Sequence, residues 1–338
     1  MATRWFDAHL DLAYMALNGR DMHADTAACA GPDLPAAVTL RSLAEGSVTH
    51  CLGTIFTEAG GSPQQKQCYP EGDFQAANAA GLQQLALYEA WRDDAGGEPS
   101  DAAKAKPPTF GVLIEGADPI LDAADLSEWV SGGVVAIGMA WWKPSRYAGG
   151  NGTDIGLSDR GRVLAATMDG LGLVHDASHL SDRAFWELAK ATDKVIVASH
   201  SNCRALVGGG GRGENQRHLH DDQIREIIKR GGIIGLNLFS KFLRPVAADD
   251  TATRATIADC LAHIEHVCDL AGDRLHVGLG SDMDGGFSAL RLPQGINVPR
   301  DLQRLAEALS AEGWSDGDVE AFAFENWAGL FERFPLRL

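Results

Sequence analysis

Eight short apolar runs recur along the 338-residue chain, and residues typical of helices or loops separate each run from the next. Runs that are apolar throughout are typical of parallel strands buried on both faces. They occupy residues 5–12, 48–57, 110–115, 134–141, 172–179, 195–200, 233–239 and 275–282. Because eight strands alternating with helices close a (β/α)8 barrel, we predict an α/β fold of this TIM-barrel type.

Three of the intervening segments have clear helical signals. Residues 74–93 are rich in Ala and Leu at helical spacing, and Ser181 is suited to cap a helix over 182–191. A third helix, over 223–230, follows acidic residues and ends in basic residues before Gly231-Gly232. This order agrees with the helix dipole and with the preference for glycine after a helix.

Three other segments are predicted to be loops. Residues 94–108 are rich in Ala, Gly, Lys and Pro, and 284–300 follows the eighth predicted strand. The glycine-rich run 208–213 lacks the G-K-[ST] ending of a phosphate-binding loop and does not open a helix directly. We therefore interpret it as a mobile loop over the mouth of the barrel.

Composition limits the number of domains and the class of partner. With 45% hydrophobic residues, the chain can bury a large core, and its length is normal for one α/β barrel, so we predict a single catalytic domain over 1–338. The net charge of -17 and the pI near 5.0 argue against a nucleic acid or an anionic membrane as partner. A small molecule or a cation fits better, and a homodimer stays open.

The N-terminus and the cysteines indicate the compartment. The N-terminus runs directly into the first predicted strand without room for a signal peptide, and no apolar run has the length of a transmembrane helix. The six cysteines contain no C-x-x-C pair and match no small disulfide framework, so we expect reduced, mostly buried thiols. These features predict a soluble, cytoplasmic protein.

Potential metal ligands stand at the C-terminal ends of the predicted strands, where a barrel builds its active site. His9 and Asp11 lie two residues apart in the first strand, so their side chains point to the same face. An imidazole beside a carboxylate provides the nitrogen and oxygen donors that suit zinc. Four further candidates end other predicted strands: Glu115, His179, His200 and Asp282.

Each candidate alone has a structural alternative. His9 and Asp11 can form a hydrogen-bonded pair without metal, Glu115 can cap the next segment, and His200 can be a strand-end histidine with satisfied partners. Carboxylates and imidazoles that converge on one mouth nevertheless imply a cation, because such groups are costly to bury unpaired. Three His, two Asp and one Glu suffice for two metals, with Glu115 as a bridge and a hydroxide between the ions as the nucleophile.

Other histidines are not assigned to the site. His175 precedes His179 at H-x-x-x-H spacing, but the residues before it are typical of a strand, so only the strand-end His179 is a predicted ligand. His263 and His266 lie on a predicted amphipathic helix, where we expect them on a solvated face.

Five motifs follow one another along nearly the whole chain. They are His9-Leu10-Asp11, Ile114-Glu115-Gly116, Asp176-Ala177-Ser178-His179, Ala198-Ser199-His200-Ser201-Asn202 and Gly280-Ser281-Asp282-Met283-Asp284-Gly285. Together they resemble the membrane (renal-type) dipeptidases, peptidase family M19 of the amidohydrolase superfamily. The resemblance implies a metal-dependent hydrolase of the TIM-barrel type.

The resemblance also implies a binuclear zinc centre that hydrolyses dipeptides. By motif, His9 and Asp11 would bind the first zinc ion, and His179 and His200 would bind the second. Glu115 would bridge the two ions together with a hydroxide. The family thus implies the same ligand set that the strand ends indicate.

Two further residues match residues with known roles in the family. Asp282 matches an aspartate that acts as general base and acid, and Arg217 matches an arginine that binds the terminal carboxylate of the substrate. The predicted function is therefore zinc-dependent hydrolysis of a dipeptide. The alternatives are a related amidohydrolase acting on another small amide, an N-acyl amino acid or a lactone, and a metal-bound barrel without catalysis.

The fourth predicted strand departs from the family. Where family members commonly have a histidine within a Leu-Thr-His sequence that contacts the substrate, this chain has Met139-Ala140-Trp141. We expect Trp141 to line the substrate cleft and to narrow it. Three residues just downstream are candidates to replace the missing imidazole: Lys143, Arg146 and Tyr147.

Overall fold

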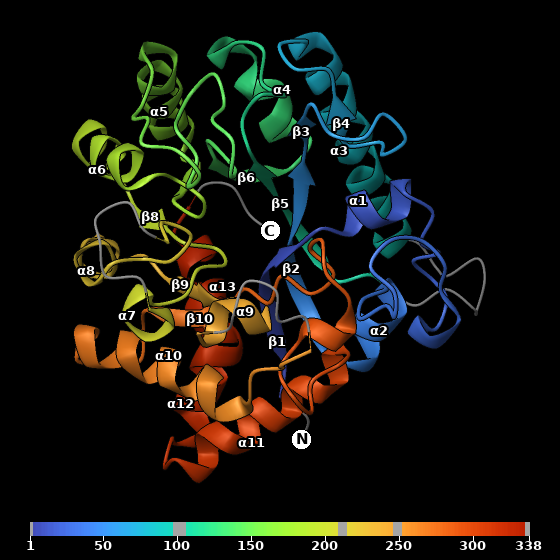
Figure 1. Cartoon of the computed structure of the whole chain (residues 1–338), viewed down its shortest axis with the longest axis vertical. Helices are drawn as coiled ribbons and strands as arrows, with labels where there is room; N and C mark the ends of the chain where they lie inside the picture. Colours follow the sequence, from blue (N-terminus) through green and yellow to red (C-terminus); the bar gives the residue numbers. More distant parts are fainter. Residues whose placement is uncertain (1–2, 97–105, 209–214, 246–251, 335–338) are drawn as a thin grey trace.

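The computed structural model describes residues 3–96, 106–208, 215–245 and 252–334. Eight parallel strands form one sheet in the order β8-β7-β6-β5-β2-β1-β10-β9. The strands are β1 Trp5–Leu10, β2 Val48–Phe56, β5 Thr109–Glu115, β6 Val134–Gly138, β7 Val174–Asp176, β8 Ile196–Val197, β9 Ile234–Leu236 and β10 Val277–Leu279. A parallel bridge between Ala198 and Ile234 joins the two edges into a ring (Figure 1). The predicted (β/α)8 barrel is confirmed.

The ends of the later strands differ from the prediction in a regular way. Each strand from β6 to β10 ends three residues before its predicted end, for example at Asp176 instead of His179 in β7. Beyond these points the chain leaves the hydrogen-bonded ladder, and the left-handed backbone of His179 (φ 66°) and Asp282 (φ 58°) redirects the chain there. The final residue of each of these apolar runs therefore lies beyond its strand and faces the mouth of the barrel.

Helices surround the ring, except for α13, which lies near its centre (Figure 1). They are α1 Leu12–Leu17, α2 Leu40–Glu45, α3 Phe74–Gly96, α4 Leu126–Ser131, α5 Asp159–Leu171, α6 Asp182–Ala191, α7 Arg204–Val207, α8 Asp221–Lys229, α9 Ser240–Leu243, α10 Ile257–Ala271, α11 Gln303–Ala311, α12 Asp316–Glu320 and α13 Asn326–Glu332. Two short strands, β3 Glu58–Ala59 and β4 Cys68–Tyr69, pair with each other after β2.

The three predicted helices are present as α3, α6 and α8. Ser181 caps α6 as predicted, because its Oγ accepts a hydrogen bond from the Ala184 N–H at 3.0 Å. The predicted loop 284–300 contains two short 3₁₀ helices, Ala289–Arg291 and Pro299–Leu302. Residues 97–105 and 209–213 of the other two predicted loops lie outside the described residues.

The apolar core has two parts, one between the sheet and the helices and one inside the ring. In the inner part, the Phe6 ring stacks on Phe331 of α13 with centroids 5.9 Å apart, and Trp327 of α13 is buried beside it. Helix α13 lies near the centre of the ring in Figure 1. It packs against the N-terminal half of β1, so the C-terminal ends of the strands stay available for the site.

The prediction of a solvated face is wrong for His263 on α10. Its side chain is buried, its Nδ1 accepts a hydrogen bond from the Cys203 N–H at 3.1 Å, and its Nε2 lies 3.1 Å from the Leu243 carbonyl oxygen. Burial lowers the pKa of His263 to about 4, so the ring is neutral at pH 7. His266 is half-buried, and its Nε2 lies 2.9 Å from Asp221 Oδ1.

The cysteines are free and mostly buried, as the sequence predicted. All six cysteines are free thiols, and four of them are buried. Within the described parts of the chain, no helix combines the length and the apolar character that crossing a bilayer requires.

Candidate metal centre

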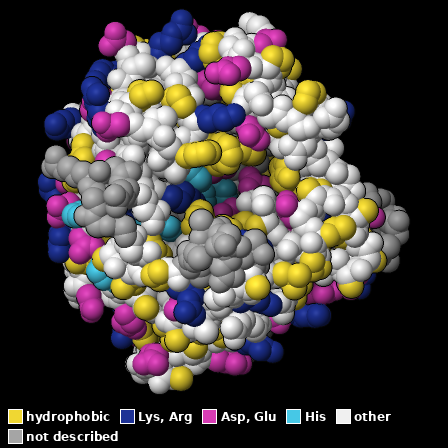
Figure 2. All heavy atoms as spheres, viewed as in Figure 1, with side chains coloured by type: hydrophobic (Ala, Val, Ile, Leu, Met, Phe, Trp, Pro, Cys, Tyr) yellow, Lys and Arg dark blue, Asp and Glu magenta, His cyan; other side chains and the backbone are white. Residues whose placement is uncertain are grey.

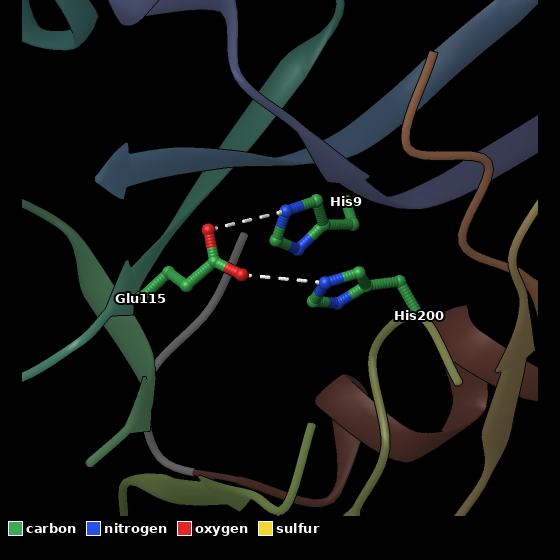
Figure 3. A group of neighbouring side chains, drawn as sticks. All are labelled: His9, Glu115 and His200. Atoms are coloured by element: carbon green, nitrogen blue, oxygen red, sulfur yellow. Dashed lines mark ion pairs between the residues drawn. The ribbon is translucent and has the colours of Figure 1, made fainter. Parts of the chain in front are cut away.

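The ends of five strands bring the predicted metal ligands together. Glu115 ends β5, and its Oε1 lies 3.1 Å from Nε2 of His179 after β7 and 3.3 Å from Nε2 of His200 after β8. Its other oxygen, Oε2, lies 3.8 Å from Nε2 of His9 in β1. Figure 3 shows His9, Glu115 and His200 pointing toward one another from three separate elements. One carboxylate therefore faces histidines on both of its oxygens.

A second set of donors adjoins the first through His9. His9 Nε2 lies 3.9 Å from Asp11 Oδ2, and the ligand atoms of His9, Asp11 and Asp282 all lie within 4.8 Å of one another. His9, Glu115 and His200 form a further group within the same limit. The six predicted side chains therefore surround two neighbouring positions, each bounded by nitrogen and oxygen donors.

The hydrogen-bond partners of this cluster fit bound cations. Nδ1 of His179 lies 2.9 Å from Asn151 Oδ1, an amide oxygen that can only accept, so Nδ1 carries the proton and Nε2 has a free lone pair. That lone pair faces His200 Nε2 at 3.0 Å. His9 Nε2 and Asp11 Oδ1 are buried without a hydrogen-bond partner among the described residues. Cations between these atoms would satisfy all of them.

Electrostatics also favour positive charge at the centre. Burial raises the pKa of all three carboxyl groups, and the next cause is a neighbouring carboxylate, which for Glu115 is Asp282. Burial likewise lowers the pKa of the three imidazoles, to about 3 for His9. Bound cations would stabilise the ionised carboxylates, and neutral imidazole is the form that binds metal.

Asp282 and a glycine in the same loop form one side of the centre. Asp282 Oδ2 accepts a hydrogen bond from Asn237 Nδ2 at 2.8 Å, which fixes the carboxylate and leaves Oδ1 for other partners. A side chain on Gly285 would place its Cβ 1.9 Å from Asp282 Oδ1. The loop therefore requires glycine at this position so that the carboxylate can face the metal ligands.

Arg217 lies beside the metal ligands with its guanidinium buried. Nη2 donates to the His200 carbonyl oxygen at 2.7 Å, Nη1 donates to Ser201 Oγ at 2.9 Å, and the group lies 5.0 Å from the Phe242 ring centroid. Arg217 Nε is buried without a hydrogen-bond partner among the described residues. These contacts hold a positive charge at the wall of the cavity.

A cavity of about 450 Å³ opens onto the centre. Figure 2 shows histidine side chains at the bottom of this hollow, with hydrophobic side chains at its rim. Its lining includes Asp11, Glu115, His179, His200, Arg217 and Asp282. Polar groups therefore converge at the bottom of a concave, partly aromatic site, which is typical of a small-molecule site.

Trp141 lines this cavity, although β6 ends at Gly138 and the residue belongs to the following loop. Its ring lies edge-on to Phe56 at 4.9 Å and tilted to His179 at 6.2 Å between centroids. The three suggested replacements for the family imidazole do not line the cavity. Each of them instead donates hydrogen bonds to backbone carbonyl oxygens. Lys143 donates to Ala59, Arg146 to Asp118 and Ile120, and Tyr147 to Ile120.

Several lining or supporting residues were not predicted from the sequence. Tyr14, Asp33 and Glu58 line the cavity from the segments after β1 and β2, and Asn151 orients His179. Nothing in the local sequence distinguishes these residues from residues that lie outside a site. Asp176 is different, because it lies within one of the five family motifs and supports the site through Ser199.

Comparison with known proteins identifies the family. Residues 1–333 match the family described as membrane dipeptidase, peptidase family M19. The chain belongs to this family. The predicted resemblance is thereby confirmed, and the match includes every helix and strand described above. A Klebsiella pneumoniae protein encoded in the region 5′ of pqqA is 32% identical to this M19 chain over 214 residues, which are 61% of this chain and 74% of that protein.

Solved structures of two metallopeptidases share the fold. A metallopeptidase from Rhodobacter sphaeroides, liganded with a phosphinate mimic of the dipeptide L-Ala-D-Ala, superposes with a TM-score of 0.80 at 25% identity. The match covers 98% of this chain and 99% of that one. The M19 metallopeptidase described as dipeptidase AC matches with a TM-score of 0.80 at 26% identity over 98% of this chain and 99% of that one.

An uncharacterised dipeptidase from Schizosaccharomyces pombe is a further relative by sequence. It is 34% identical over 156 residues, which are 46% of this chain and 33% of that protein.

Proposed function

We propose that this M19 chain is a metal-dependent dipeptidase. One observation supports this most strongly: imidazole nitrogens and carboxylate oxygens from the ends of five strands converge at the bottom of a cavity that also contains a buried arginine. Two of these atoms, His9 Nε2 and Asp11 Oδ1, are buried without a hydrogen-bond partner among the described residues. Family membership and the dipeptide mimic bound to the Rhodobacter relative point to the same substrate class.

The proposed cofactor is a pair of zinc ions. His9 and Asp11 would hold the first ion, His179 and His200 the second, and Glu115 both, because its two oxygens face different histidines. When bound, such ions activate a water molecule and polarise the carbonyl group that it attacks. The nitrogen and oxygen donors suit zinc.

Asp282 is the proposed proton carrier. Its Oδ2 is occupied by the Asn237 N–H, so Oδ1 is the atom that exchanges the proton. Asp282 would accept a proton from the attacking water and return it to the departing amine, as one well-placed carboxylate can do in both directions. Burial raises the pKa of Asp282, which brings proton uptake closer to neutral pH.

Arg217 is the proposed partner of the substrate's terminal carboxylate. We expect Arg217→Ala to raise KM for dipeptides by on the order of tenfold or more, because a charge-assisted hydrogen bond to a carboxylate is lost. KM for C-terminally amidated dipeptides should change much less. Steady-state kinetics on matched free and amidated substrates measures this difference.

Arg225→Ala on the exposed face of α8 provides a control for loss of an arginine. Thermal unfolding of both variants separates substrate binding from stability, since Arg217 also contacts the His200 carbonyl oxygen. An equal rise of KM for free and amidated substrates would remove the carboxylate role from Arg217.

Trp141 is the proposed shape filter of the cavity. An indole donates one hydrogen bond but carries no positive charge, so it stabilises a developing oxyanion less than an imidazolium does. We expect Trp141→Ala to broaden the range of accepted dipeptides and Trp141→His to raise kcat on simple ones. A panel of L,L and L,D dipeptides compares the variants.

Trp142→Ala is the matched control, because the neighbouring Trp142 is 55% exposed and does not line the cavity. Its substrate profile should equal that of the wild type. If both Trp141 variants also keep the wild-type profile, Trp141 does not select the substrate.

A dipeptide panel with chelator-treated and zinc-reloaded protein tests the proposed function. We expect hydrolysis to disappear with the metal and to return with zinc. Preferred hydrolysis of lactones, N-acyl amino acids or other amides would favour a related amidohydrolase. Bound metal without hydrolysis of any substrate would favour a barrel that has lost catalysis.

Three broader expectations belong to the same proposal. We propose that residues 1–338 form a single catalytic domain and that the protein acts in the cytoplasm on a small dipeptide substrate, without a nucleic acid or membrane partner. The alternative to a monomer is a homodimer. Light scattering separates these two states, and cell fractionation tests the cytoplasmic location.

A further inference from the structure

A buried aspartate and serine lie directly behind two of the proposed metal ligands. Ser199 Oγ lies 2.6 Å from Asp176 Oδ2 and 2.8 Å from His200 Nδ1. The same hydroxyl oxygen lies 3.4 Å from His9 Nδ1. All four side chains are at least 98% buried, so each polar atom depends on these partners and not on water.

The direction of the serine hydroxyl follows from the surroundings of Asp176. Asp176 Oδ1 accepts the backbone N–H groups of Ser178 at 3.0 Å and Ser199 at 2.8 Å, and these bonds favour the ionised carboxylate. Oδ2 can therefore only accept, and the Ser199 hydroxyl must donate its single hydrogen to it. The lone pairs of Ser199 Oγ then remain to accept hydrogen bonds, and their neighbours are His200 Nδ1 at 2.8 Å, Ser178 Oγ at 3.3 Å and His9 Nδ1 at 3.4 Å.

The histidine tautomers follow in turn. With Ser199 Oγ as acceptor, His200 Nδ1 carries the proton, and so does His9 Nδ1 at the longer distance. We propose that Asp176 and Ser199 are positioning residues that fix His9 and His200 in the tautomer whose Nε2 is free to bind a metal ion. This inference rests on the metal ligands of the proposed function. It extends the proposed function by naming the residues that fix the tautomers of two of these metal ligands.

A second buried Asp–Ser pair, on β1 and just after β10, provides a comparison. Asp7 accepts the backbone N–H groups of Ser281 at 2.8 Å and His9 at 3.2 Å on Oδ1, and its Oδ2 accepts the Ser281 hydroxyl. Ser281 Oγ also accepts the Met283 N–H at 3.3 Å, and among the described residues it forms no hydrogen bond with an imidazole. The two pairs thus have the same backbone pattern, but only Asp176–Ser199 reaches ring nitrogens.

The isosteric substitution Asp176→Asn tests the direction of the two hydrogen bonds that link His200 through Ser199 to Asp176. We call this chain of hydrogen bonds the relay. Two backbone N–H groups donate to the Oδ1 position, so the asparagine oxygen should lie there and its NH₂ group should face Ser199 Oγ. The hydroxyl would then accept from the amide and donate to His200 Nδ1, which at 2.8 Å is nearer than Ser178 Oγ at 3.3 Å. His200 Nε2 would carry the proton, and we expect metal affinity to fall by about 10- to 100-fold, as for other lost supporting contacts of metal ligands.

Two measurements report on the variant independently of catalysis. Nitrogen-15 NMR of histidine-labelled, metal-free protein identifies the protonated ring nitrogen of His200, with the resonance assigned through His200→Asn. Competition with a chromogenic zinc chelator gives the affinity. Asp7→Asn is the matched control and should leave the His200 tautomer unchanged. Ser199→Ala removes the acceptor altogether and should lower zinc affinity by about tenfold, with Ser240→Ala as the buried-serine control.

The expected result is an Nδ1-protonated His200 in the wild type and an Nε2-protonated His200 in Asp176→Asn, together with weaker zinc binding. If Asp176→Asn does not fold, Ser199→Ala decides through the same two measurements. Wild-type tautomer and wild-type affinity in both folded variants would overturn the proposal, as would an Nε2-protonated His200 in the wild type. Wild-type protein that binds no zinc would instead contradict the proposed function, while the tautomer measurement would still test the relay.

Discussion

Glu115→Gln is expected to abolish stable binding of both metal ions and, with it, dipeptide hydrolysis. The amide keeps the size of the side chain but removes the negative charge and one of the two acceptor oxygens that face His9, His179 and His200. Losing a supporting contact to a metal ligand lowers affinity by about 10- to 100-fold, so losing a ligand shared by two ions should cost more than about 100-fold. Elemental analysis after gel filtration measures the bound metal.

A glutamate outside the site provides the control for this substitution. Glu128→Gln on the exposed face of α4 makes the same chemical change and should retain both ions and full activity. Thermal unfolding of the metal-free proteins shows whether the Glu115 variant still folds. Two tightly bound ions in Glu115→Gln would contradict its bridging role.

Asp282→Asn is expected to lower kcat by on the order of a hundredfold or more while zinc stays bound. A hundredfold loss corresponds to about 2.7 kcal/mol of transition-state stabilisation. The asparagine oxygen can still accept the Asn237 N–H, so the side chain should keep its position, but the amide can no longer take up a proton. Parallel measurement of kcat and metal content separates proton transfer from metal binding.

Asp269→Asn on the exposed side of α10 is the corresponding control and should change neither quantity. Near-wild-type kcat in Asp282→Asn would show that another group carries the proton. If the variant loses bound metal as well as kcat, Asp282 is instead a metal ligand together with His9 and Asp11, whose ligand atoms lie close to it.

The barrel was predictable because its strands are buried on both faces. Continuous apolar runs such as Thr109–Glu115 that alternate with helical segments are typical of buried parallel strands. All eight predicted runs contain a strand. The strand ends were less predictable. An apolar pattern does not show where the backbone turns out of the ladder, and in β6–β10 this happens three residues before the run ends.

The proposed ligands were predictable for a related reason. In a parallel barrel all C-terminal strand ends meet at one face, so the location of a strand-end residue such as Glu115 or His200 follows from the barrel topology alone. The supporting residues have no such rule. Asn151 meets His179 across 28 positions of the chain, and Ser199 reaches both His9 and Asp176 through the packing of three strands.

The error at His263 has a similar physical origin. Its helix is amphipathic, but its ring lies at the boundary where α10 meets the segments that contain Cys203 and Leu243. Helical periodicity cannot show that backbone groups of two other segments will satisfy both ring nitrogens. The same reason explains why the suggested replacements for the family imidazole do not line the cavity. Arg146 and Tyr147 donate hydrogen bonds to a backbone oxygen of a neighbouring loop, which the sequence pattern does not show.

The most direct test of a binuclear metal dipeptidase is the number of zinc ions per chain, measured together with hydrolysis on the same samples. Protein purified without chelator and incubated with excess zinc is analysed for metal, and dipeptide hydrolysis is followed as zinc is removed and restored in steps. We predict two zinc ions per chain and hydrolysis that rises and falls with their number. A ratio that stays at or below one, or hydrolysis that persists after complete removal of metal, would contradict the proposed binuclear centre.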